Sequence, residues 1–241
     1  MSGSRFLTAE WRYLGMLNYE TDPAVVAPLV PPGCELDAFE GCVFISVVGF
    51  QFLRTRVLGI PFPFHLNFEE VNLRFYVRRR AEGEWRRGVV FVKELVPRRA
   101  IAWVARTVYH ENYVALPMRH SVPPPPWSGS GSVRYEWRLG SSWQGLRLAI
   151  AGDPVVPSED AEESFITEHY WGYASQPDGT TVEYRVDHPR WSVWRATTAA
   201  LDCDVAALYG DRFRESLSAP PTTAFVADGS AVVVRRGRRL G

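Results

Sequence analysis

Residues 68–96, which read FEEVNLRFYVRRRAEGEWRRGVVFVKELV, decide the fold. In residues 69–79 the apolar and polar side chains alternate with a period of two, which predicts a strand with one apolar and one polar face. The polar face carries Glu70, Asn72, Arg74, Tyr76 and Arg78. A polar turn at residues 81–84 then predicts a second strand that returns beside the first.

The return strand, residues 89–96, is rich in valine and apolar on both faces. Strict alternation places Lys93 on the face of Phe91 and Glu94 on the opposite face. Two apolar faces are typical of a strand covered on both sides, as in a sandwich or a closed barrel. One of the two charges then faces inward and needs a partner. The alternative is that both lie near the strand end and reach water.

A helix is predicted after this strand, because Pro97 suits the first helical position and apolar residues follow it at helical spacing. Arg98 and Arg99 fall in the first turn, where the helix dipole favours anions rather than cations. An anionic partner, either Glu94 or a ligand carboxylate, would compensate these cations. The alternative is a pair of solvated arginines.

The rest of the 241-residue chain reads as further antiparallel strands with short connections. Residues 43–52 are apolar on both faces, residues 133–139 alternate cleanly, and short helices are predicted after Asp22, after Ser158 and over 202–209. Strand and helix do not alternate as a parallel sheet requires. The expected fold class is α+β: a single domain, residues 1–241, formed by a mostly antiparallel, closed or nearly closed barrel with flanking short helices.

Two loop segments differ from the rest of the chain. Residues 123–131, PPPPWSGSG, combine proline stiffness with Gly/Ser flexibility and predict a surface loop within the one domain. Residues 57–65, VLGIPFPFH, are apolar, and their two prolines exclude a central strand. Such a segment predicts a binding wall or a subunit contact, and the alternative is a loop folded over the core.

Composition limits the partners. Lys+Arg and Asp+Glu are both 27, so the formal net charge is zero, which argues against nucleic acid or an anionic membrane as partner. The three cysteines form no close pair, so neither a disulfide framework nor a zinc site is expected. No signal peptide and no membrane-spanning apolar run is visible. These features predict a cytoplasmic protein.

No motif points to a metal or cofactor, and none is expected. The chain has no HExxH, no GxSxG elbow, no GxGxxG and no phosphate-binding loop. Residues 168–173, EHYWGY, gather an acid, a base and phenols at a predicted helix end. His169 is therefore a candidate for ligand binding. The alternative is aromatic packing around a hydrogen-bonded histidine.

Several segments together carry a family likeness: FLTAEWRYLGMLNYE, VPPGCELDAFEG, FEEVNLRFYVRR, YHENYVALPMRH, EHYWGY and VEYRVDHPRWSVW. Taken together they resemble the YqjF-like family of uncharacterised bacterial proteins over nearly the whole chain. That resemblance implies the fold of acetoacetate decarboxylase, a β-rich, cone-shaped barrel with flanking helices and a central pocket.

The decarboxylase carries a glutamate, a short gap and Pro-Lys-Lys, with one lysine forming a Schiff base. Residues 94–100, ELVPRRA, look similar, but Arg98 and Arg99 stand where the lysines would be. Arginine stays protonated and forms no such imine. Lys93, the chain's only lysine, is five positions from the matching site. The resemblance thus implies the pocket without the relative's nucleophile.

We therefore expect a small-molecule enzyme, lyase- or decarboxylase-like, acting on a carboxylate or carbonyl compound. The candidate catalytic residues are Lys93, Glu94 and Glu70, and the candidate substrate-binding residues are Arg74, Arg98, Tyr76 and His169. One alternative is a binding protein that uses the same pocket without chemistry. The other is a homo-oligomeric scaffold whose subunit contact is the apolar segment 57–65.

Overall fold

The computed structural model describes residues 3–61, 66–98, 112–123 and 130–240. Its strands are β1 (Arg5–Thr21), β2 (Glu35–Leu36), β3 (Val43–Val57), β4 (Ile60–Pro61), β5 (Phe68–Ala81), β6 (Glu84–Val96), β7 (Tyr113–Ala115), β8 (Met118–Ser121), β9 (Ser130–Leu139), β10 (Ser142–Ala151), β11 (Trp171–Ser175), β12 (Thr181–Asp187), β13 (Val193–Asp202), β14 (Thr223–Arg235) and β15 (Arg238–Leu240). Its helices are α1 (Pro23–Val26), α3 (Glu162–Thr167), α4 (Val205–Tyr209) and α5 (Arg214–Ser218), with 3₁₀ turns η1 (Ala27–Leu29) and η2 (Asp211–Phe213).

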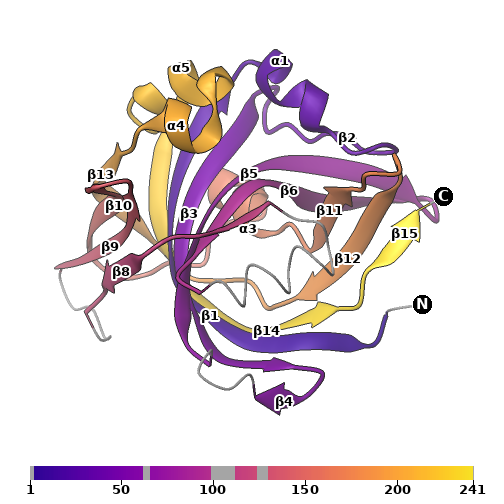
Figure 1. Cartoon of the computed structure of the whole chain (residues 1–241), viewed down its shortest axis with the longest axis horizontal. Coiled ribbons are helices and arrows are strands. Elements are labelled where there is room, and N and C mark those ends of the chain that lie inside the picture. The colour runs from indigo at the N-terminus through magenta and orange to yellow at the C-terminus, as the bar shows by residue number, and fades with distance from the viewer. Residues whose placement is uncertain (1–2, 62–65, 99–111, 124–129, 241) are drawn as a thin grey trace.

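Seven of the strands form a ring, seen nearly end-on in Figure 1. Its order is β12–β11–β6–β5–β3–β1–β14, and β14 pairs again with β12. Two of these joins are short: β11 pairs with β6 at two positions, and so does β12 with β14. The result is a nearly closed barrel with short flanking helices, which confirms the predicted fold class.

The predicted alternation along β5 is confirmed, and it separates the two sides of the barrel wall. Val71, Leu73, Phe75 and Val77 belong to the hydrophobic core outside the ring. The polar face, by contrast, points into the barrel, where Glu70, Asn72 and Arg74 line a cavity. These three polar side chains are thus enclosed rather than exposed to solvent.

The strand β3 is covered on both faces, as its apolar pattern predicts. Phe44, Val48, Phe50 and Phe52 face the barrel interior. The other face packs against a second layer, β8–β9–β10–β13, through Tyr135 and Trp137, which are fully buried. A side chain at Gly49 would place its Cβ 2.6 Å from the Tyr135 ring, so only glycine lets this layer approach so closely.

A β-bulge in β6 corrects the predicted faces of Lys93 and Glu94. Leu73 pairs with Lys93 but Arg74 pairs with Phe91, so one extra residue lies between them on β6. Beyond the bulge the alternation is reversed: Phe91 and Glu94 line the cavity. Lys93 lies on the outer face, where its Nζ donates to the carbonyl of Leu208 in α4. Strict alternation was therefore wrong at this point.

Other predicted elements have different bounds or lie outside the described residues. The helix expected after Ser158 begins later, with Ala161 as its N-cap residue, and ends at Thr167. The helix expected after Pro97 and most of the 123–131 loop fall outside the described residues. Within the described ranges, the helices are all too short or too polar to cross a membrane.

Candidate functional site

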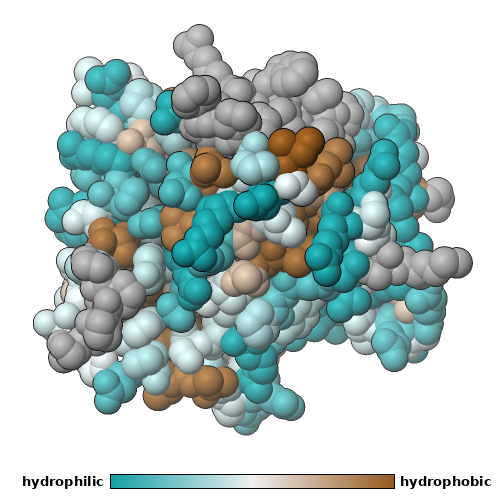
Figure 2. Space-filling view, turned by 90° about the horizontal axis from the view of Figure 1, so that it is seen from below, coloured by the Kyte–Doolittle hydropathy of each residue, from teal (hydrophilic) through white to brown (hydrophobic). Residues whose placement is uncertain are grey.

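The barrel interior holds a cavity of about 160 Å³. Most of its lining is apolar and aromatic, with residues such as Trp11, Phe50, Phe52, Phe91, Trp171, Tyr184 and Trp191. A cavity of ~150 Å³ accommodates a molecule the size of benzene, so this one suits a small organic ligand. Figure 2 views the molecule from the β4 side, where hydrophobic residues gather at the centre of the face between hydrophilic ones.

One polar strip crosses this apolar lining. It consists of Glu70, Asn72 and Arg74 on β5, together with Glu94, which pairs opposite Asn72 on β6. Glu70 accepts a hydrogen bond from Asn72 Nδ2 (3.1 Å) and another from the Tyr113 hydroxyl (3.3 Å). Both glutamates are almost completely buried, with 1–2% of their surface exposed. Burying a carboxylate costs free energy. Titratable groups in such surroundings are therefore kept mostly where function requires them, at binding or catalytic sites.

Arg74 is the cation of the strip. Its guanidinium donates to the Tyr76 hydroxyl (3.4 Å) and to the carbonyl of Ile166 (3.3 Å). Within the described part of the chain, no carboxylate forms an ion pair with it. Its planar fork of donors suits a carboxylate.

A chain of buried hydrogen bonds holds Arg74 from behind. Tyr76 bonds to Ser46 (2.7 Å), Ser46 donates to Asn18 Oδ1 (2.7 Å), and Asn18 donates to Thr223 (3.1 Å). Thr223 in turn donates to Glu162 at the start of α3. Because Ser46 uses its proton toward Asn18, every donor in the chain points the same way, and each bond polarises the next. The guanidinium is thus fixed before any ligand arrives.

A second polar group meets the cavity at His169. Its Nε2 lies 3.2 Å from Asp37 Oδ2, which also accepts from Arg87 Nε at 2.7 Å. Burial lowers the pKa of His169 to about 4, against the opposing effect of Asp37, so the ring is neutral at pH 7. Burial alone would raise the pKa of Asp37, but the hydrogen bonds from His169 and Arg87 outweigh it and lower that pKa.

Several cavity residues carry a buried polar atom without a hydrogen-bond partner among the described residues. They are Trp11 Nε1, Thr55 Oγ1, Asn72 Oδ1 and His169 Nδ1. Buried polar groups are nearly always satisfied in native proteins, so a cluster of such atoms calls for water or a ligand. The four atoms include both donors and acceptors.

The structure brings together four of the candidate site residues predicted from sequence. Glu70, Arg74, Glu94 and His169 all line the cavity. Tyr76 lies just behind the wall, bonded to Arg74, with its ring tilted by 45° against the His169 ring at a centroid distance of 4.7 Å.

Two other candidates lie elsewhere. Lys93 is on the outer face, as described above, and burial there lowers its pKa. Arg98 is exposed; burial raises the pKa of Glu69, but the hydrogen bond from His120 and the charge of Arg98 outweigh it and lower that pKa. Arg99 falls outside the described residues. The apolar segment 57–65 exposes 68% of both Leu58 and Ile60, and its role as a subunit contact stays a prediction.

Sequence reasoning missed Asp37, Arg87 and Asn72. Asp37 stands in an irregular segment after β2, and 132 residues separate it from His169. Asn72 was read as a member of a polar strand face, and Arg87 was not singled out. The sequence carried one signal for these residues, a charged strand face with aromatic neighbours. Solvated strands commonly show the same pattern, so it does not distinguish a site from a surface.

The low pKa of His169 makes stability depend on pH. The unfolded chain binds a proton near pH 6.5, whereas the folded chain binds it only near pH 4. The free energy of unfolding therefore falls as the pH drops from 6.5 to 4, by up to about 3 kcal/mol from this residue. Urea titrations of wild type and His169→Gln across this range measure it, and the variant is expected to lose less stability. Parallel curves would contradict the prediction.

Comparisons with known proteins agree with this architecture. A curated relative, "Uncharacterized protein YqjF" from Bacillus subtilis (strain 168), is 28% identical over 182 residues, covering 74% of this chain and 72% of its own length.

Solved structures share the fold at low identity. Acetoacetate decarboxylase from Legionella pneumophila matches with a TM-score of 0.67 and 13% identity, over 99% of this chain and 88% of its own. The enduracididine biosynthesis enzyme MppR complexed with pyruvate matches with a TM-score of 0.68 and 14% identity, over 100% and 92%. These likenesses establish an acetoacetate decarboxylase-like fold, which the sequence resemblance implied.

The family model described as "Uncharacterized conserved protein (COG2071)" matches residues 8–231. The chain therefore belongs to the DUF2071 family, to which the YqjF-like resemblance pointed.

Proposed function

We propose that this protein is a lyase- or decarboxylase-like enzyme that binds a small carboxylate in the barrel cavity and acts on it by acid–base chemistry. The observation that carries the proposal is Arg74: a guanidinium fixed by a hydrogen-bond chain, facing an apolar cavity, without a carboxylate partner among the described residues. An unpaired cation in such surroundings is costly, and a ligand carboxylate offsets that cost.

Of the two buried glutamates, Glu94 stands closer to Arg74 along the strand direction. It pairs opposite Asn72, two residues along the strand from Arg74, which corresponds to about 7 Å. Glu70 lies two residues further on, at about 13 Å from Arg74. A carboxylate held by Arg74 thus extends toward Glu94 first, and this residue is assigned the role of acid or base, with Glu70 supporting it.

The proteins that share the fold support a substrate class for this proposal. The shared fold is that of an acetoacetate decarboxylase and of MppR, whose structure contains pyruvate. Both names point to small oxo acids. The imine chemistry of the decarboxylase is not carried over, because Arg98 occupies a lysine position of that motif and Lys93 faces away from the cavity.

Ligand titration tests the proposal. Pyruvate and acetoacetate are expected to bind in a calorimeter, whereas the uncharged pyruvamide is expected to bind far more weakly. Arg74→Gln is expected to weaken carboxylate binding by roughly ten- to a hundredfold, since a charge-assisted hydrogen bond contributes about 1.5–3 kcal/mol. The matched control is Arg147→Gln, which removes an exposed arginine on β10 and leaves binding unchanged.

Two results decide between the readings. Equal binding of the acid and the amide to wild type contradicts the assignment of Arg74 as the anion site. Binding of the acids without any turnover favours a non-catalytic binding protein that uses the same cavity.

A further inference from the structure

His169 is held firmly in one orientation by its neighbours. Tyr76 and Phe165 pack on its ring at centroid distances of 4.7 and 5.1 Å. Asp37 fixes Nε2, and Arg87 and the backbone fix Asp37: its amide donates to the carbonyl of Tyr76 at 3.0 Å. Only 1% of the His169 side chain is exposed.

The protonation state of the ring follows from these contacts. A carboxylate only accepts, so Nε2 must carry the hydrogen that it donates to Asp37. In the neutral ring Nδ1 is then an unprotonated acceptor. This atom is buried and has no partner among the described residues, in a residue that lines the cavity. A carboxylate that orients a histidine and leaves its other nitrogen without a partner is the arrangement of a general base.

We propose that His169 is the proton-transferring base of the cavity, that Asp37 is its positioning residue, and that the substrate is a small 2-oxo acid with a hydrogen on the carbon next to its carbonyl. This inference rests on the proposed function, because Arg74 must hold the acid's carboxylate. It goes further by giving the role of base to His169, which leaves Glu94 the role of acid, and by naming the bond that breaks.

The step balances without a further reactant. Nδ1 takes the proton from the carbon next to the carbonyl, the C–H electron pair forms a carbon–carbon double bond, and the carbonyl π pair moves onto oxygen. The enolate charge develops beside the Arg74 guanidinium, which favours it. Return of a proton from the imidazolium, after exchange with solvent, restores the acid with a new hydrogen.

The groups around His169 determine the pH range in which it can act as a base. The charged and titratable groups that face it are Asp37, Arg87 on β6, and Arg74 and Tyr76 on β5. The two arginines disfavour a second positive charge, and Asp37 favours it. The base form is therefore present throughout the neutral range, and exchange is lost only in acid, as His169 becomes protonated.

Proton exchange in D₂O, followed by ¹H NMR, tests this inference. Wild type is expected to accelerate the loss of the C3 proton signals of pyruvate and 2-oxobutyrate over buffer. His169→Gln keeps a donor toward Asp37 but has no base, and it is expected to lower the rate by about a hundredfold or more. His120→Gln is the matched control, because His120 also contacts a carboxylate, that of Glu69 at 3.6 Å, but lies outside the cavity.

The tautomer of His169 and the exchange rate together test the role of Asp37. With ¹⁵N-labelled histidine, wild type is expected to show one ring with Nε2 protonated and Nδ1 bare, among only five histidines in the chain. Asp37→Leu is expected to lose this signature and to lower the exchange rate with little change in pyruvate affinity, whereas Asp37→Asn retains part of the rate. A merely structural role would leave the tautomer unchanged.

The outcomes distinguish a failure of this inference from a failure of the proposed function. This inference is overturned if acids that bind wild type exchange their protons equally fast in His169→Gln. It is also overturned if exchange is lost only in Glu94→Gln. Either outcome leaves the proposed function standing. Failure of every acid to bind wild type overturns both.

Discussion

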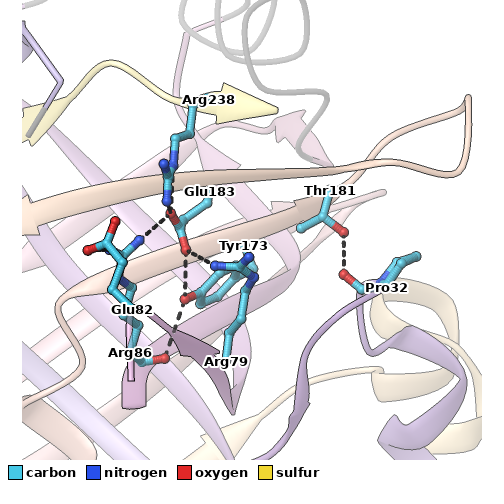
Figure 3. Close-up of polar contacts among 8 residues, drawn as sticks. All are labelled: Pro32, Arg79, Glu82, Arg86, Tyr173, Thr181, Glu183 and Arg238. Atoms are coloured by element: carbon cyan, nitrogen blue, oxygen red, sulfur yellow. Dashed lines mark hydrogen bonds and ion pairs between the residues drawn. The ribbon is translucent and has the colours of Figure 1, made fainter. Parts of the chain in front are cut away.

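Replacing Glu183 with alanine is expected to lower the free energy of unfolding by about 3 kcal/mol or more. The Glu183 side chain is completely buried on the outer face of β12, where it accepts from Arg79 (3.2 Å), Arg86 (2.9 Å) and Arg238 (2.9 Å), and from the Tyr173 hydroxyl (3.3 Å) (Figure 3). Without it, three cations remain close together. Arg238 is half exposed, so it reaches solvent and moderates the loss.

Chemical denaturation of Glu183→Ala and Glu183→Gln measures this effect. The glutamine keeps part of the hydrogen bonding, so its loss is expected to be smaller. Glu35→Ala is the matched control, because it breaks a single ion pair with Arg78 whose partners are 40% and 53% exposed. Such a pair contributes less than about 1 kcal/mol. A loss in Glu183→Ala no larger than in the control would refute the role of the cluster.

Gly229→Ala is the second substitution expected to have a large effect. Gly229 pairs with Arg12 between β14 and β1, has φ +81°, and a Cβ there would lie 2.0 Å from the carbonyl oxygen of Trp11. Both the left-handed backbone and the clash with a neighbouring strand oppose a side chain. We expect a loss of roughly 3–5 kcal/mol, since strain and overpacking add. Trp11 lines the cavity, so ligand binding is expected to weaken as well.

Gly179→Ala separates the two causes. Gly179 has nearly the same φ, +79°, but nothing lies within 4 Å of a Cβ at this position. Its substitution is expected to lose only the backbone contribution of about 1–2 kcal/mol. Thermal unfolding of both variants measures the difference. If the two lost equal stability, the contact with Trp11 would have no part in the effect.

The fold could be predicted largely from local patterns. Period-two alternation along β5 and the two apolar faces of β3 depend on the side chains of one strand, and both were confirmed. The alternation did not reveal that the polar face of β5 lies inside the barrel. That outcome depends on the ring closing round it, through β12 and β14 far along the chain.

The candidate site was predictable only in part, because its remaining features are not local. The β-bulge before Lys93 arises in the pairing of β5 with β6 and leaves no mark in the residues of β6 alone. It decides that Glu94, and not Lys93, enters the cavity. Asp37 acquires a role only because the fold brings it to His169, and spacing along the chain says nothing about that contact.

The two short joins of the ring flank the same hairpin, β11–β12, which supplies Trp171, Gly172 and Tyr184 to the cavity wall. The hairpin pairs with β6 at only two positions. On the outer face of the barrel, Arg79 on β5 and Arg86 on β6 donate hydrogen bonds to Glu183 and so hold the hairpin in place. The ion pairs of Glu183 thus supplement the short strand pairings that hold this part of the cavity wall. Substitutions in this cluster are therefore expected to change the width of the cavity without changing a residue that lines it.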